Sequence, residues 1–177
     1  MDKLDWDEYF MSLAFVVAQK SIDTSTKHGC VVISDDHSIL SVGYNGPPRG
    51  CDDEKMPIDK RPEKYYVMSH SEVNAISNAA KHGTKLEGST FYITGHPCSR
   101  CYGAIVNAGA KKIIYGPVDC VAYFGPGEKE TIDLMNEGKE KPLIEMVQYD
   151  GDIGDSLAKA IKYMDSKCGI KLTCLKS

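Results

Sequence analysis

The sequence predicts an α/β fold, a three-layer α/β/α sandwich built on a mixed sheet of about five strands. Two observations indicate this fold class: two β-branched segments separated by a turn suggest an early hairpin, and helix-strand units follow it. With 177 residues, 42% of them hydrophobic and 26% charged, the chain can bury a sizeable core. We therefore expect a single domain over residues 1–177, without internal repeats.

The expected elements come from hydrophobic periodicity and from the turn residues between apolar segments. Trp6 and Phe10 lie at helical spacing and are expected in the core, and Val73, Ile76 and Ala80 share one side of a second helix. In chain order we expect a helix over residues 5–20, strands over 30–33 and 39–44, a helix over 70–82, a strand over 90–94, a helix from 98 to about 109, a strand over 112–116, a helix over 128–137, a strand over 143–148 and a helix over 152–167.

Residues 51–67 interrupt this pattern with a long polar stretch that carries two prolines and charges of both signs. A loop of this length in a compact domain is usually functional or mobile. Two interpretations stay open from the sequence. The stretch is either a lid over an active or effector site, or a solvated surface insertion.

Two short motifs carry the chemistry of the chain. They offer one imidazole from His70, two thiolates from Cys98 and Cys101, and a further carboxylate from Glu72. Three ligands of this kind suit zinc and leave a fourth position for water, which is the pattern of a catalytic site. Cys98 and Cys101, three residues apart, can reach one ion from the first turn of a helix. Because His70 and Glu72 are two residues apart, both can reach it only from a helix N-terminus.

Each motif alone also has an ordinary explanation. The Cys98-x-x-Cys101 spacing fits a redox pair or half of a structural zinc site, and Ser69-x-x-Glu72 fits a helix capping box. A structural zinc site would need a fourth protein ligand, and none stands at conventional spacing. His28 and His37 are interpreted as loop histidines. The two motifs together, in this order, favour a catalytic metal centre.

The order His-x-Glu followed by Pro-Cys-x-x-Cys is the signature of the zinc deaminases, in which the Glu is a general acid/base and not a ligand. The chain resembles the cytidine deaminase superfamily and, within it, the deoxycytidylate (dCMP) deaminases. The resemblance covers about residues 5–150. It also includes three further segments: residues 6–11 (WDEYFM), 43–51 (GYNGPPRGC) and 107–112 (NAGAKK).

The resemblance implies an activity: zinc-dependent hydrolysis of dCMP to dUMP and ammonia in pyrimidine deoxynucleotide metabolism. It assigns His70, Cys98 and Cys101 to one catalytic Zn²⁺ and the proton transfers to Glu72. The expected substrate-binding residues are Asn45 at the deoxyribose, Ser25 and Lys27 near the phosphate, and Tyr123 over the base. The expected allosteric nucleotide site comprises Asn45, Gly46 and Arg49.

The resemblance also implies a homo-oligomer, often a hexamer, activated by dCTP and inhibited by dTTP with Mg²⁺. A net charge of −4 argues against a broad nucleic-acid surface. Seven unpatterned cysteines, without a secretory leader or an apolar run of membrane-spanning length, favour the reducing cytoplasm and no membrane partner. The alternatives are a related deaminase acting on dCTP or tRNA adenosine, and a non-catalytic zinc module.

Overall fold

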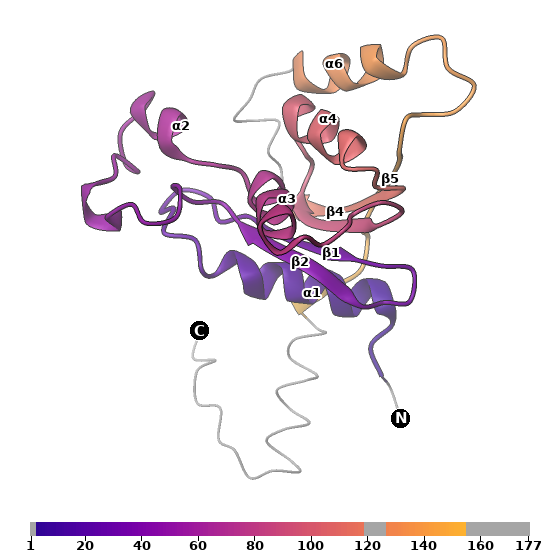
Figure 1. The fold of residues 1–177 in the computed structure, drawn as a ribbon, viewed down its shortest axis with the longest axis horizontal. Helices are drawn as coiled ribbons and strands as arrows, with labels where there is room; N and C mark the ends of the chain where they lie inside the picture. Colours follow the sequence, from indigo (N-terminus) through magenta and orange to yellow (C-terminus); the bar gives the residue numbers. More distant parts are fainter. Residues whose placement is uncertain (1–2, 119–126, 155–177) are drawn as a thin grey trace.

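The structure is a computed structural model that describes residues 3–118 and 127–154 (Figure 1). Most of the helix expected over residues 152–167 lies outside the described residues. The described elements are α1 (Trp6–Ala18), β1 (Gly29–Ile33), β2 (Ile39–Tyr44), the short 3₁₀ helix η1 (Asp53–Lys55), α2 (Glu63–Val67), α3 (Ser71–His82), β3 (Thr90–Gly95), α4 (Ser99–Asn107), β4 (Lys112–Val118), α6 (Gly127–Asn136) and β5 (Glu145–Gln148).

The five strands form one mixed sheet in the order β2-β1-β3-β4-β5. β1 pairs antiparallel with both β2 and β3, whereas β3, β4 and β5 run parallel to one another. β1 and β3 are buried along their whole length because helices cover both faces of the sheet. The sheet confirms the predicted hairpin and the helix-strand units that follow it.

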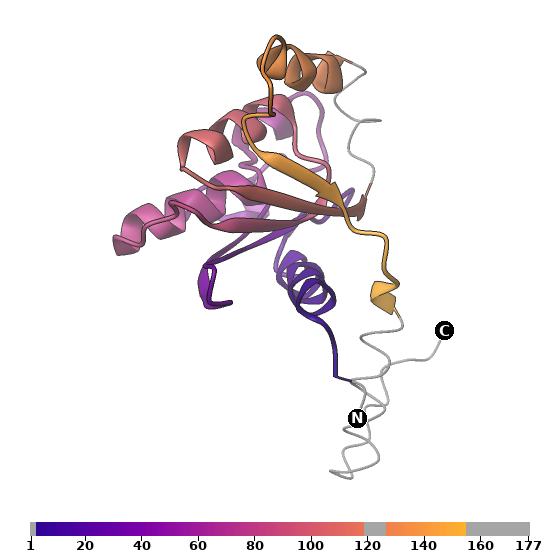
Figure 2. The same ribbon diagram turned by 90° about the vertical axis from the view of Figure 1, so that its right-hand side faces the viewer.

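Helices cover the two faces unequally. Figure 2 shows α1 on one side of the sheet and α3, α4 and α6 on the other, which confirms the three-layer sandwich. The core under α1 is built on Phe10, Met11, Ala14, Val31, Ile33, Tyr92 and Ile114. The core on the opposite face includes Cys30, Ala75, Phe91, Ile93, Tyr102, Ile105 and Ile113.

The prediction that Trp6 lies in the core is wrong. Its side chain is 54% exposed, whereas Phe10, one turn later, is fully buried. Trp6 lies in the first turn of α1 and stacks on His37 in the β1–β2 turn, with ring centroids 4.1 Å apart. Helical spacing places Trp6 on the side of α1 that faces the sheet. The first turn of the helix, however, lies beside the loop between β1 and β2 rather than over the centre of the sheet.

The helix expected over residues 70–82 is confirmed as α3. Of the three apolar residues at helical spacing, Ile76 packs against the core while Val73 and Ala80 are exposed, and the side chains that α3 buries include Ala75 and Ala79. The helix approaches Gly43 of β2 closely, and a Cβ added there would lie 2.4 Å from the Ala75 nitrogen. At this separation only a small side chain fits between α3 and β2, which is why Ala75 faces Gly43.

Candidate metal centre and active site

Two helix starts meet at the carboxyl end of β3. His70 is the N-cap of α3, and Cys98 is the N-cap of α4. Neither side chain caps its own helix, so both point away from the helix axis toward one another. Cys101 follows Cys98 by one turn. Crevices at the carboxyl ends of strands are where open α/β sheets bind ligands, and the cluster lies at such an end.

The three candidate ligand atoms are spaced for one metal ion. His70 Nδ1 lies 3.5 Å from Cys98 Sγ and 3.4 Å from Cys101 Sγ. Tetrahedral zinc with bonds of about 2.0 Å to nitrogen and 2.3 Å to sulfur requires nitrogen-sulfur separations of about 3.5 Å. These residues therefore fit Zn²⁺, and in the described part of the chain no other group of histidine, cysteine or acidic residues has such spacing.

The electrostatics of the cluster favour a metal-binding thiolate. A hydrogen bond from Cys101 lowers the pKa of Cys98 to about 4, burial opposes this, and a second hydrogen bond from His70 adds to it. The hydrogen bond with Cys98 raises the pKa of Cys101, and burial raises it further. The Cys98 thiolate, which accepts hydrogen bonds from Cys101 and His70, gives the cluster a negative charge that favours the binding of a cation.

Glu72 lies in the first turn of α3 and is 5% exposed. Burial raises the pKa of its carboxyl, while the nearby imidazole of His70 lowers it. Its Oε2 accepts a hydrogen bond from Ser71 Oγ at 2.9 Å. The capping-box alternative is wrong, because the N-cap is His70, and Ser69 instead pairs through its backbone with Gly46.

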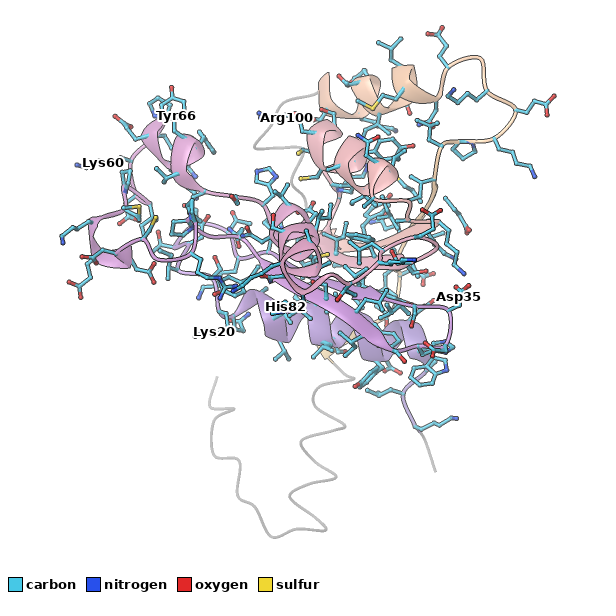
Figure 3. The ribbon with its side chains drawn as sticks, in the orientation of Figure 1. Lys20, Asp35, Lys60, Tyr66, His82 and Arg100 are labelled. Atoms are coloured by element: carbon cyan, nitrogen blue, oxygen red, sulfur yellow. The ribbon has the colours of Figure 1, made fainter. Side chains whose placement is uncertain are left out.

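The cluster opens into a pocket of about 400 Å³, a size ordinary for small-molecule sites. Glu72, His70 and Cys98 are among the residues that line it. The remaining polar wall includes His28, Asn45, Arg61, Lys64, Arg100 and Glu128. Figure 3 shows Arg100 at the start of α4, on the side that faces α2. The pocket thus joins a metal centre and a buried carboxylate to a wall with several cationic side chains.

Only some of the predicted substrate-binding residues line the pocket. Asn45 lines the pocket, where its Nδ2 donates to Asp23 Oδ2 at 3.1 Å and to the Thr26 carbonyl at 2.9 Å. Ser25 and Lys27 are exposed and do not line the pocket, whereas Thr26 between them does. Tyr123 lies outside the described residues. The contacts of these residues with a substrate stay predictions.

Of the three predicted effector residues, Asn45 lines the pocket, whereas Gly46 and Arg49 lie outside it. Gly46 pairs with Ser69 and does not line the cavity. Arg49 is exposed and donates a hydrogen bond from Nη2 to Asn78 Oδ1 of α3 at 3.1 Å. An effector site at Gly46 and Arg49 would therefore be separate from the metal pocket, and it too stays a prediction.

Several pocket residues escape sequence reasoning. His28 was interpreted as a loop histidine, yet it lines the pocket, and its Nδ1 lies 3.1 Å from Thr94 Oγ1. Glu128 of α6 accepts a hydrogen bond from the Ser99 amide at 2.6 Å and so joins α6 to the start of α4. His96 differs from these two, because its place directly before Pro97 and Cys98 already suggested a position near the pocket; it lines the pocket, with its ring edge-on to that of Tyr115. No local motif marks His28 or Glu128, because they reach the site only in the folded chain.

His28 should make stability depend on pH. Burial of the ring lowers its pKa to about 4, the charge on His70 lowers it further, Asp23 raises it and Lys64 lowers it. Unfolding restores a pKa near 6.5. Stability is therefore unaffected above about pH 6.5 and falls between about pH 6.5 and 4, where the unfolded state alone binds the proton.

Between pH 7 and pH 4.5, we expect the free energy of unfolding of the wild type to fall by about 2 kcal/mol more than that of the His28→Gln variant, because glutamine does not titrate. The measurement is the free energy of urea unfolding of both proteins at the two pH values. Equal losses in the wild type and the variant would contradict a neutral, buried His28.

The fold and the site together define a class of protein: an α/β sandwich with a cluster of three candidate metal ligands and a buried carboxylate beside it. Comparison with known families then specifies the class. Residues 4–117, more than half of the chain, match the cytidine and deoxycytidylate deaminase zinc-binding region, and the chain belongs to this family. This confirms the resemblance seen in the sequence.

Individual relatives agree with this family. Human deoxycytidylate deaminase is 38% identical over 119 residues, which span 64% of this chain and 66%, just under two thirds, of the human protein. The deoxycytidylate deaminase of Mycobacterium phage D29 is 32% identical, over 65% of this chain and 97% of its own length. The crystal structure of cyanophage S-TIM5 dCMP deaminase with dCMP and dUMP gives a TM-score of 0.64 at 26% identity, over 84% of this chain and 100% of that one.

Proposed function

We propose that the protein is a zinc-dependent hydrolase that converts dCMP and water to dUMP and ammonia. The single observation that carries this proposal is the burial of Glu72 beside the His70, Cys98 and Cys101 cluster, in a pocket that is also lined by cationic side chains. The family match and the dCMP deaminases among the relatives support the same reaction.

Each step of the reaction has a residue to perform it. Zinc held by the cluster would supply a Lewis acid that activates water for attack on an amidine carbon. Glu72 takes a proton from the attacking water and delivers a proton to the pyrimidine N3. It then takes the remaining proton from the hydroxyl group added at C4 and passes it to the amino group, which leaves as ammonia while the carbonyl of dUMP forms. The raised pKa of Glu72 suits this role, because a general acid/base works best when its pKa lies near the working pH.

The anionic end of the substrate has a candidate location. Arg61, Lys64 and Thr26 line the same pocket as the metal cluster, and a guanidinium binds phosphate oxygens through paired hydrogen bonds. We place the 5′-phosphate against Arg61, since Lys64 is already paired with Asp23 at 2.7 Å. The phosphate contacts predicted at Ser25 and Lys27 would need movement of two exposed side chains.

A side-by-side assay tests the function. We expect ammonia release from dCMP, little or none from dCTP, deoxycytidine or adenosine-containing RNA, and about one zinc per chain in the same sample. Turnover of dCTP or of RNA instead would assign the pocket to another deaminase substrate. Zinc without turnover of any of the four, even with dCTP and Mg²⁺ added as effectors, would favour a non-catalytic zinc module.

We further propose, from the family resemblance, a cytoplasmic homohexamer that dCTP activates and dTTP inhibits with Mg²⁺. Arg49 is exposed outside the metal pocket, so its guanidinium is accessible to the phosphates of an effector. Rates of dCMP turnover unchanged by dCTP and dTTP would contradict the regulatory part. In the described part of the chain, no helix is both long and apolar enough to cross a membrane.

A further inference from the structure

The segment between β2 and α3 contributes no apolar side chain to the core. From residue 47 to residue 70, all of which the structure describes, the only buried residue is Lys64. α2, with five residues, is far too short to be stable as an isolated helix. Figure 1 shows α2 and η1 projecting to one side of the sandwich. Polar contacts must therefore hold this segment in place.

The buried contact of the segment is an ion pair. Lys64 Nζ lies 2.7 Å from Asp23 Oδ1, and the two side chains are only 7% and 4% exposed. The same carboxylate oxygen accepts hydrogen bonds from the backbone amides of Ser25 at 2.8 Å and Thr26 at 3.1 Å. Burial would raise the pKa of Asp23, but the hydrogen bonds from Lys64 and from these amides outweigh it and lower the pKa. Asp23 is thus a rigid anion in the turn before β1.

The other polar tie between these two segments is weaker. Thr24 Oγ1 donates to Asp59 Oδ1 at 2.6 Å, but this hydrogen bond is exposed and competes with water. The backbone pair between Gly46 and Ser69 joins only the two ends of the segment. Separation of a buried ion pair leaves a charge without its partner, which is much more costly than loss of an exposed hydrogen bond. The Asp23–Lys64 pair is therefore the main attachment of α2.

The attached segment carries part of the pocket wall. Arg61 and Tyr65 flank Lys64 and line the same cavity. Arg61 Nε donates to the Tyr65 hydroxyl at 2.9 Å, and its guanidinium carbon lies 6.0 Å from the centre of the tyrosine ring. Figure 3 shows Lys60 and Tyr66 on the outer side of the segment, away from the sheet. The segment thus presents one face to the pocket and the other to solvent.

We propose that Lys64 is a positioning residue whose ion pair with Asp23 holds Arg61 and Tyr65 over the pocket, where they close on the anionic end of the substrate. Lys64 acts through the segment, because its ammonium group is already bonded to Asp23. This inference decides between the two interpretations of residues 51–67 in favour of a lid. The identity of the anion rests on the proposed function, whereas the attachment of the segment does not.

The first test is Lys64→Met, which keeps the length of the side chain and removes the charge. We expect the KM for dCMP to rise about tenfold with kcat changed less than about twofold, because the segment binds substrate but performs no chemistry. Trypsin should cleave the Lys55–Met56 bond about tenfold faster in the absence of substrate, because the segment opens. Zinc content should not change. Lys60→Met is the matched control, since Lys60 is an exposed lysine of the same segment.

A second variant separates attachment from general instability. Lys64→Met leaves the Asp23 carboxylate buried without its cation, and the double variant Asp23→Asn with Lys64→Met removes both charges. We expect the double variant to regain melting temperature but to keep the high KM and the fast cleavage. The proposal would be overturned if trypsin cleaved Lys64→Met at the wild-type rate, or if the double variant had the wild-type KM for dCMP. Absence of dCMP turnover in the wild type would refute the proposed function, while the cleavage rates would still test the attachment.

Discussion

Glu72→Gln should retain zinc and lose about 10³- to 10⁴-fold in kcat, because glutamine keeps the shape of the side chain but cannot carry protons. The loss should be at the upper end of what general acid/base catalysis contributes, since the proposed mechanism uses this one carboxylate for several proton transfers. The KM for dCMP should change little. Steady-state kinetics and a zinc count on the same sample measure both expectations.

Glu128→Gln is the matched control for Glu72→Gln. Glu128 is also a carboxylate that lines the pocket, but its Oε2 is bonded to the Ser99 amide, and a glutamine oxygen can accept the same hydrogen bond. We therefore expect less than about a tenfold change in kcat. Equal losses from both variants would show that the pocket needs only negative charge. Loss of zinc from Glu72→Gln would show that Glu72 is a ligand or a structural support.

Cys98→Ala should abolish zinc binding and lower the stability of the protein by several kcal/mol. Removal of one of three protein ligands leaves the ion with two, and the free energy of metal binding is also free energy of folding. The expected measurements are no retained zinc after dialysis and an earlier urea unfolding transition. A chelator should shift the wild-type transition toward that of the variant and leave the variant itself unchanged.

Cys30→Ala is the control for the removal of a thiol. Cys30 is fully buried in β1 and is not part of the metal cluster. Its replacement should leave zinc content and sensitivity to the chelator as in the wild type, with only the small cost of a cavity. A zinc-loaded, stable Cys98→Ala protein would exclude Cys98 as a ligand.

The strands and the metal cluster could be predicted from the sequence because both depend on short stretches of the chain. The expected strand over residues 39–44 has the bounds of β2, and the helix expected to end before Gly83 does so, with Gly83 in the left-handed conformation at φ 67°. His70, Cys98 and Cys101 each lie at or just after a helix start, where the backbone leaves little choice of direction. Local geometry was sufficient for these features.

Which residues face the pocket was not predictable in this way. The turn before β1 offers Ser25, Thr26 and Lys27, and only Thr26 lines the cavity. Exposed Trp6 and Val73 show the same difficulty, since periodicity identifies an apolar side of a helix but not what lies opposite it. The packing partner decides burial, and that partner comes from elsewhere in the chain.

The sequence by itself determined the fold class and identified the candidate metal ligands and the carboxylate beside them, because these follow from local pattern and from the chemistry of the residue types. Only the tertiary structure decided that Lys64 is buried. Lysine is rarely buried without a partner, and its partner Asp23 lies 41 residues earlier in the chain. The two meet because the sheet brings the turn before β1 beside the segment before α3. No local pattern in the sequence predicts that contact.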